Sequence, residues 1–288
     1  MAILMGLISA LCWGATDFLA GHTTRQIGVA RSLFYSQSFG FLVLTVWIVS
    51  HPALFHVDTN SFGLAMAVLA AVCNLVAMAS LLKALSIGKA SVVAPIVSLY
   101  GAVTTVLSVI AGEPITTMAV ASLVLCIFGA SLASISKSSD GKPEAPASIG
   151  LGLLSALMFG LGFWLQGAFA VKDLGIVDTL WVYYLVAVVV LLAILIRSRN
   201  LSPPRGSIFA LILTISLLSL CGFSALAYGS GTGHVAIVTV LSSLASAVTA
   251  VLGFAIRGER PSVPQWIGIS IIMFGVVSLK LTSGIATG

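Results

Sequence analysis

The stretch GLISALCWG at residues 6–14 occurs a second time as GLLSALMFG at residues 152–160. The string SLYGAVTTVL at 98–107 likewise matches SLASAVTAVL at 243–252. Further pairs keep nearly the same spacing: IGVARSLF at 27–34 with LGIVDTLW at 174–181, Gly112-Glu113 with Gly258-Glu259, and IFGA at 127–130 with MFGV at 273–276. The offset between partners stays within 145–147 residues, a register that chance matches would not keep. The chain is therefore one unit, duplicated with almost no insertions.

A polar stretch separates the two copies. It reads KSSDGKPEAPAS at residues 137–148, in the middle of the chain, and it is the longest polar stretch in the sequence. Its proline, glycine, serine and charged residues are typical of a flexible linker. We therefore expect a first repeat over residues 1–136, a linker over 137–148 and a second repeat over 149–282.

Composition indicates that both repeats lie in a lipid bilayer. Of 288 residues, 59% are hydrophobic and 7% are charged, whereas roughly 25% are charged in a typical soluble domain. Apolar runs of about 18–22 residues recur, long enough to cross a ~30 Å hydrocarbon core as helices, and they lack the alternation of barrel strands. We expect ten spans: 2–20, 33–50, 61–82, 92–111, 117–136, 149–170, 179–196, 207–228, 235–256 and 264–282.

The number of spans in each repeat predicts the relation between the repeats. Five is an odd number, so the second repeat must enter the membrane from the face opposite to the first. The expected fold is all-α and integral to the membrane, with ten transmembrane helices arranged as two inverted five-helix repeats. Such pairs place a substrate site at their interface near the bilayer midplane.

The charges predict orientation rather than a binding patch. The net charge of +5 is spread over short connections, so we expect no nucleic-acid partner. Two cations, Lys172 and Lys280, lie on one side of the expected topology, and eleven lie in the alternate connections. These eleven are Arg25, Arg31, Lys83, Lys89, Lys137, Lys142, Arg197, Arg199, Arg205, Arg257 and Arg260. The positive-inside rule then places both termini outside the cytoplasm.

Several motifs together resemble the drug/metabolite transporter superfamily, and within it the ten-helix EamA-type transporters. They are Ser9, Trp13 and Gly14 in the first span, Arg31 at the start of the second, ALSIGKASVVAPIVSLYGAV at 84–103, and the Gly-Glu pairs ending in Glu113 and Glu259. The resemblance covers essentially the whole chain. It implies export or exchange of amino acids, related metabolites or drugs through a central cavity, with both termini in the cytoplasm. The second repeat departs from the pattern, because Thr239 and Val240 stand where the first repeat has Pro95.

Asp17 is the only acidic residue inside an apolar span. Intramembrane carboxylates are costly and usually mark function, although the expected end of the span at residue 20 puts Asp17 in its last turn, near the interface. With Ser9 and Trp13 it forms one polar helix face, at spacings of four residues. Arg31 opens the second span, where a cation opposes the helix dipole. We expect Asp17 and Arg31 to form a pair at the cavity mouth, either to bind a charged substrate group or as a structural ion pair.

The other cavity candidates are polar residues within or at the ends of spans. They are Asn74, Lys83, Ser98, Gln166, Tyr228 and Ser243. For Lys83 and Tyr228 the alternative is a position at the membrane interface, and for the others it is hydrogen bonding between helices. Glu113 and Glu259 are interpreted as capping and packing residues.

A secondary transporter of a small metabolite is the leading functional hypothesis. The chain has no HExxH, GxSxG or Walker A motif, and its four cysteines show no metal-ligand spacing. We therefore expect no enzymatic activity, no cofactor and no metal; a non-transporting or enzymatic polytopic membrane protein is the alternative. The expected partners are a small-molecule substrate, the lipid of the cell membrane and, as a coupling ion, protons. The oligomeric state is left open.

Overall fold

A computed structural model describes most of the chain. The described residues are 1–51, 61–87, 93, 96–113, 115–133, 146–245, 247–249, 251–252 and scattered positions from 263 to 278. Residues 137–145 of the expected linker, Pro95, Glu259 and most of the expected tenth span lie outside this part.

The described residues form helices and their connections, with no strand among them. The helices are α1 (Ala2–Ile27), α2 (Val29–Ser50), α3 (Ser61–Ile87), α5 (Tyr100–Ile110), α6 (Thr117–Ala133), α7 (Pro146–Leu165), the π-helix η2 (Gln166–Ala170), α8 (Val171–Leu174), α9 (Ile176–Arg197), α10 (Ser207–Ser230) and α11 (Val235–Ser242). Six helical segments in the described part are long and apolar enough to cross a membrane: α1, α2, α3, α7 with its extension to Leu174, α9 and α10. The protein is thus an all-helical membrane protein.

Several helices run past the ends that the apolar pattern predicts. The first expected span ended at residue 20, but α1 continues to Ile27 through the polar residues HTTRQ at 22–26. The second and seventh spans begin earlier than expected, directly after Gly28 and Gly175. Hydropathy marks the lipid-crossing part of a helix, whereas the backbone hydrogen bonds continue into polar sequence until a residue ends them.

Two glycines make the same corner at equivalent places in the two halves. Gly28 joins α1 to α2 with φ 82° and ψ 163°, and Gly175 joins α8 to α9 with φ 85° and ψ 171°. Residues with a Cβ are strained at such positive φ angles, whereas glycine is not. The duplicated sequence therefore repeats its backbone geometry as well as its residues.

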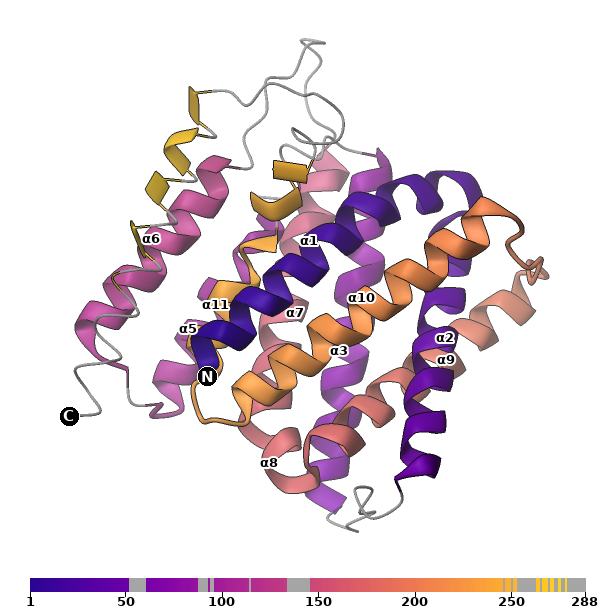
Figure 1. The fold of residues 1–288 in the computed structure, drawn as a ribbon, viewed down its shortest axis with the longest axis horizontal. Coiled ribbons are helices and arrows are strands. Elements are labelled where there is room, and N and C mark those ends of the chain that lie inside the picture. The colour runs from indigo at the N-terminus through magenta and orange to yellow at the C-terminus, as the bar shows by residue number, and fades with distance from the viewer. Residues whose placement is uncertain are drawn as a thin grey trace.

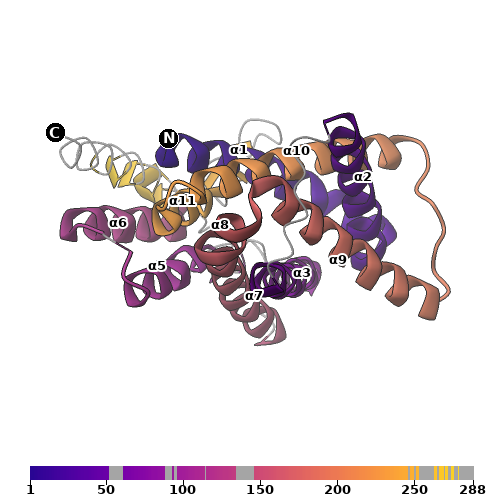
Figure 2. The ribbon, with the colours of Figure 1, turned by 90° about the horizontal axis from the view of Figure 1, so that it is seen from below.

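A contact between a helix of one half and a helix of the other half occurs twice, unless the two helices are equivalents of each other. In the second contact, each helix is replaced by its equivalent from the other half. Helix α1 packs on α10 and α11, and its counterpart α7 packs on α3 and α5. Helix α2 packs on α9 and α5 packs on α11, so these pairs join counterparts. Figure 1 shows α1 beside α10, and Figure 2 shows these two helices in one layer with α3 and α7 in the other. Most of the contact surface of each half is thus with the other half.

Close contacts at two glycines repeat this exchange at atomic detail. The Thr249 hydroxyl donates to the Gly14 carbonyl at 3.0 Å, and the Thr104 hydroxyl donates to the Gly160 carbonyl at 3.0 Å. A Cβ added to Gly14 or Gly160 would lie 2.5 Å from the Cβ of a valine on the partner helix. Small residues allow helices in a membrane to approach this closely, which increases their dispersion contacts.

The fourth and ninth expected spans, which contain α5 and α11, are each interrupted by a turn, and the two turns lie at matching positions. Leu99 N–H donates to the Ile96 carbonyl and Leu244 N–H donates to the Leu241 carbonyl, both at 3.2 Å and both across only three residues. The sequence allows a proline bend only in the first half, at Pro95. Because the second half has the same irregular turn with Val240 in that place, a proline is not what the turn requires.

Candidate functional site: a central aromatic cavity

A small cavity lies between the two halves. Its volume is about 40 Å³, and its lining comes from α1, α3, α7, α10 and the interrupted helices that carry α5 and α11. The lining residues are Trp13, Thr16, Asp17, Met78, Leu81, Val97, Tyr100, Phe159, Phe163, Phe223 and Ala245. These six helices are the first, third and fourth expected spans of each repeat. Both halves therefore contribute to the lining, the first half with more residues than the second.

The cavity lies near the middle of its helices. Trp13 is about halfway along α1, and Phe159 is about halfway along the helix that runs from Pro146 to Leu174. These two residues are equivalent in the repeat, as are Met78 and Phe223. The lining is thus built from matching positions of the two halves, near the middle of their helices.

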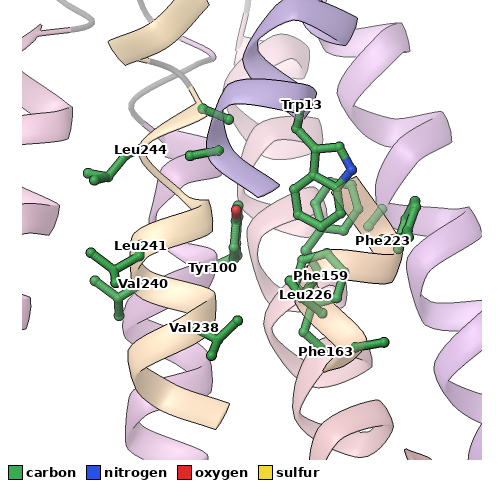
Figure 3. Packing of buried hydrophobic residues seen from close by; sticks show 14 of the residues in the cluster. Trp13, Tyr100, Phe159, Phe163, Phe223, Leu226, Val238, Val240, Leu241 and Leu244 are labelled. Carbon is green, nitrogen blue, oxygen red and sulfur yellow. The ribbon is translucent and has the colours of Figure 1, made fainter. Parts of the chain in front are cut away.

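Five of the eleven lining residues are aromatic. Trp13 stacks on Phe163 with ring centroids 5.2 Å apart, and Phe159 stacks on Phe163 at 5.3 Å. Phe223 meets Trp13 edge to face at 4.9 Å, and Tyr100 meets Phe163 in the same way at 5.4 Å. Figure 3 shows these five side chains converging from four helices. Such pairs are stabilising beyond their burial by about 0.5–1.5 kcal/mol each.

Among the described residues that line the cavity, Asp17 is the single charged one. Asp17 lies in the last turn of the expected span, which ends at residue 20, but the helix does not end there, because α1 continues for ten further residues to Ile27. Its equivalent in the second half is Phe163, which also lines the cavity. Equivalent positions of the two halves therefore line the cavity with different chemistry, a carboxylate on one side and a ring on the other.

Two hydroxyl groups lie close to this carboxylate. Tyr100 is near enough for Asp17 to act on it electrostatically, and its hydroxyl shares a hydrogen bond of 2.9 Å with the Ser242 hydroxyl. Thr16 also lines the cavity, and its hydroxyl has no hydrogen-bond partner in the described part of the chain. The site thus offers one negative charge and a few polar atoms within an apolar wall.

The structure does not bring Arg31 to Asp17. An Arg31 guanidinium nitrogen donates to the Ser202 carbonyl at 2.7 Å, and the nearby Tyr35 hydroxyl donates to the Leu201 carbonyl at 2.7 Å. Both contacts join α2 to the connection between α9 and α10. Among the described residues Arg31 therefore holds a connection in place, outside the cavity.

Asn74 and Gln166 are buried close to the cavity but do not line it. Asn74 lies one turn before Met78 on α3 and packs so tightly against Gly162 that a Cβ there would collide with its amide oxygen. Gln166 lies three residues beyond Phe163 and begins the π-helix η2. The Nδ2 and Oδ1 atoms of Asn74 and the Nε2 atom of Gln166 have no hydrogen-bond partner in the described part of the chain. π-helical turns occur often at functional sites.

Of the remaining candidates, two serines are buried and two residues are exposed outside the cavity. Ser98 and Ser243 are buried, and a Cβ on Gly101 would lie 3.1 Å from the Ser243 hydroxyl, which places Ser243 at the contact of α5 with α11. Lys83 is exposed, and Tyr228 is 47% exposed, both outside the cavity lining. Sequence reasoning missed Tyr100, Phe163 and Phe223 as lining residues. The repeat alignment held a signal for Phe163, because it is the partner position of Asp17.

Glu113 contacts a helix of the other half. Its carboxylate oxygens accept from the Ala236 N–H, in the first turn of α11, at 3.3 and 3.4 Å. The capping interpretation therefore holds for Glu113, although the capped helix is α11 and not the helix that follows it. Burial raises the pKa of the Glu113 carboxyl above its ordinary value, and the nearby Ala236 N–H, His234 and Lys172 act in the opposite direction.

The long apolar helices and the cavity between two like halves are typical of a membrane transporter that holds its cargo in the middle of the bilayer. The EamA-like transporter family matches residues 1–135 and 147–280, and the chain therefore belongs to this family, within the drug/metabolite transporter superfamily. The motif resemblance is confirmed by this match. The protein is accordingly a membrane transporter of the drug/metabolite type.

Two further proteins are similar to this chain. An uncharacterized protein of Methanocaldococcus jannaschii is 29% identical over 134 residues, which cover 46% of this chain and 96% of the relative. That relative is thus about the length of one half. A solved crystal structure superposes with a TM-score of 0.80 at 15% identity, covering 100% of this chain and 99% of the other, and at this identity the likeness shows the fold alone.

Proposed function

We propose that this protein is a secondary transporter that moves a small metabolite through the central cavity by alternating access. The observation that carries the proposal is the lining itself, which comes from matching positions of both halves at mid-helix depth. Amino acids and related amphipathic compounds are the proposed cargo, export across the cell membrane is the proposed direction, and protons are the proposed coupling ion. Asp17 is the proposed carrier of the proton.

The size of the cavity suits an occluded state. A volume of about 40 Å³ holds a few water molecules at most, since each needs about 10–15 Å³. A metabolite needs several times that space, so the two halves must move apart to admit one. The aromatic rings fill the centre when no cargo is present and keep water and ions from leaking through.

Ten spans in two inverted five-helix units are the architecture we propose for the membrane. The exchange of helix pairs between halves, the matching Gly28 and Gly175 corners and the odd number of expected spans per repeat all support this arrangement. In this arrangement Glu113 and Arg31 lie at opposite membrane faces. Each residue makes a contact between the halves, Glu113 with Ala236 and Arg31 with Ser202. One contact would therefore have to break to open one face, and the other contact to open the opposite face.

Reporter fusions at the C-terminus test the orientation. The cation distribution of eleven against two places both termini outside the cytoplasm, so a C-terminal alkaline phosphatase fusion should be active and a C-terminal fluorescent-protein fusion dark. Family resemblance implies the opposite pattern. A bright fluorescent fusion paired with an inactive phosphatase fusion would reject the orientation derived from charge.

Flux through reconstituted vesicles tests the transport proposal. Purified protein in liposomes should show saturable counterflow of at least one compound from a panel of amino acids, amines and small drugs. Ala245→Phe, which fills the cavity, should abolish that flux. The matched control is Ala65→Phe, because Ala65 is an exposed residue on the outer face of α3 and lies outside the cavity. A folded wild-type protein that moves no compound, or equal flux through both variants, would reject the proposal.

A further inference from the structure

The central cavity has a charge that selects among cargo classes. In the part of the chain that the structure describes, Asp17 is the single charged lining residue, and none of the lining residues is basic. The nearest cationic candidates of the sequence point elsewhere: Arg31 is bound to the Ser202 carbonyl, and Lys83 is exposed. A carboxylate on the cargo would therefore meet a like charge and no partner, which is costly in a medium of low dielectric constant.

The aromatic wall suits the opposite charge. Trp13, Phe159 and Phe163 form a stacked column with centroid distances of 5.2 and 5.3 Å, and Phe223 and Tyr100 close its sides. The faces of aromatic rings are negative, so they attract cations placed over them, and Trp attracts them best. Aromatic cages of this kind bind quaternary ammonium groups elsewhere in proteins.

A proton-binding role alone does not account for this lining. A carboxylate that only accepts and releases protons needs a water path or hydrogen-bonding neighbours, and aliphatic residues would serve as well as rings to keep it dry. Here five rings line the same cavity as one acid, and each ring residue is 8% exposed or less. The combination of one carboxylate, several ring faces and no base recognises a positive charge that carries apolar groups.

We propose that the cavity selects small organic cations of the alkylammonium class, with Asp17 as the counter-charge and the faces of Trp13 and Phe163 as the binding surface. This inference rests on the transport function proposed above and specifies the cargo. The cation enters between the stacked rings, which separate to hold it and close on each other when it leaves. The Thr16 hydroxyl is placed to accept a hydrogen bond from a donor on the cargo.

Three compounds of nearly equal shape test the charge preference. Choline carries the cation, 3,3-dimethylbutan-1-ol is its uncharged carbon isostere, and glycine betaine adds a carboxylate to the same ammonium group. Tryptophan fluorescence and calorimetry on the purified full-length protein should give saturable choline binding. Choline should bind at least about tenfold more tightly than either comparison compound. Equal binding of the three, or no saturable choline binding, would overturn the proposal.

Variants assign the preference to its residues. Asp17→Asn keeps the shape and removes the charge, so it should bring choline down to the level of its isostere. Phe163→Leu keeps an apolar side chain without a ring face and should weaken choline binding about threefold to tenfold. Phe209→Leu is the matched control, because Phe209 is 50% exposed on α10 and lies outside the cavity. Unchanged binding by monodisperse Asp17→Asn or Phe163→Leu protein contradicts the assignment.

The outcomes separate this inference from the transport function. Flux of an amino acid by a protein that does not bind choline would leave transport standing and reject cation selectivity. Choline binding without any flux would support the cavity assignment and reject transport. If Asp17→Asn does not give a monodisperse protein, Phe163→Leu and the wild-type comparison of the three compounds still decide the question.

Discussion

The two halves of the molecule are alike where they touch each other and different where they face the cavity. At the helix contacts, Gly14 and Gly160 accept equivalent hydrogen bonds of equal length from Thr249 and Thr104. At the cavity, Asp17 in one half is matched by Phe163 in the other. The contacts must fit in both halves for the repeat to pack, whereas the lining is free to diverge. Divergence between repeats therefore indicates which residues serve the cargo and which serve the fold.

The largest effect on stability is expected at the close helix contacts that occur in both halves, those of Gly14 and Gly160. Gly14→Ala and Gly160→Ala each place a Cβ 2.5 Å from a valine Cβ and 2.7–3.0 Å from a backbone carbonyl, so the helices must separate. We expect each variant to lose about 1–3 kcal/mol of unfolding free energy. Thermal unfolding in detergent measures the loss.

Gly150→Ala on the same helix α7 is the control for Gly160→Ala. A Cβ at Gly150 meets nothing within 4 Å, and alanine is the better helix former, so the variant should be neutral or slightly more stable. If Gly14→Ala and Gly160→Ala lose very different amounts of unfolding free energy, the two contacts are not equivalent. The conclusion that the halves are alike where they touch would then be wrong.

The next largest effect concerns the residues that differ. Asp17→Phe alone removes the carboxylate and should reduce choline counterflow at least about tenfold. Adding Phe163→Asp returns one carboxylate to the cavity from the other half. If the cavity is symmetric in shape, the double variant should regain much of the lost flux, measured in the same vesicles. A monodisperse double variant as inactive as the single one would mean that the place of the charge on α1 matters beyond its presence.

The sequence predicted the membrane fold well because its strongest signals are local. The apolar length of α3 and α10 and the register of the duplication need no tertiary information. The true end of α1 was missed, since hydropathy does not mark where hydrogen bonding in a helix stops. That error placed Asp17 at the mouth of the cavity in the prediction, whereas it lines the cavity near the middle of α1.

The cavity was harder to predict than the fold. Its rings come from four helices, and a phenylalanine in an apolar run carries no sign of facing a cavity rather than lipid. Arg31 shows the converse case: its charge made it a site candidate, yet its partner is the backbone carbonyl of Ser202, which is distant in sequence. Which partner such a side chain meets depends on how the helices pack in three dimensions.

A smaller effect is expected at Arg31, which has an acidic counterpart, Asp178, in the second half. Arg31→Ala removes the hydrogen bond to the Ser202 carbonyl and should lower the unfolding free energy by about 1 kcal/mol. Choline flux should stay near the wild-type value, because Arg31 does not line the cavity. Loss of flux with unchanged thermal stability would show that Arg31 binds cargo after all; Arg31→Lys then tests whether a planar donor is needed.

The smallest effect is expected at Glu113, where the halves meet at one end of the bundle. Its contacts to the Ala236 N–H are long, 3.3 and 3.4 Å, so the cap is weak. Because burial raises the pKa of Glu113, the folded protein favours the protonated carboxyl more than the unfolded chain does. This contribution to stability is complete below the ordinary pKa of glutamate and is lost as the pH rises through the raised value.

Glu113→Gln removes the titration and keeps an oxygen that can accept from the same N–H. The melting temperature of the wild type, relative to this variant, should therefore fall slightly as the pH rises from about 4 to 7. Lys172 lowers the pKa of Glu113, so in a Lys172→Met background the fall should occur at higher pH. A difference that stays flat, or a wild type that gains on the variant with rising pH, would show that the Glu113 carboxylate is stabilised at this contact. The contact would then resemble the strong glycine contacts instead of a weak one that can open.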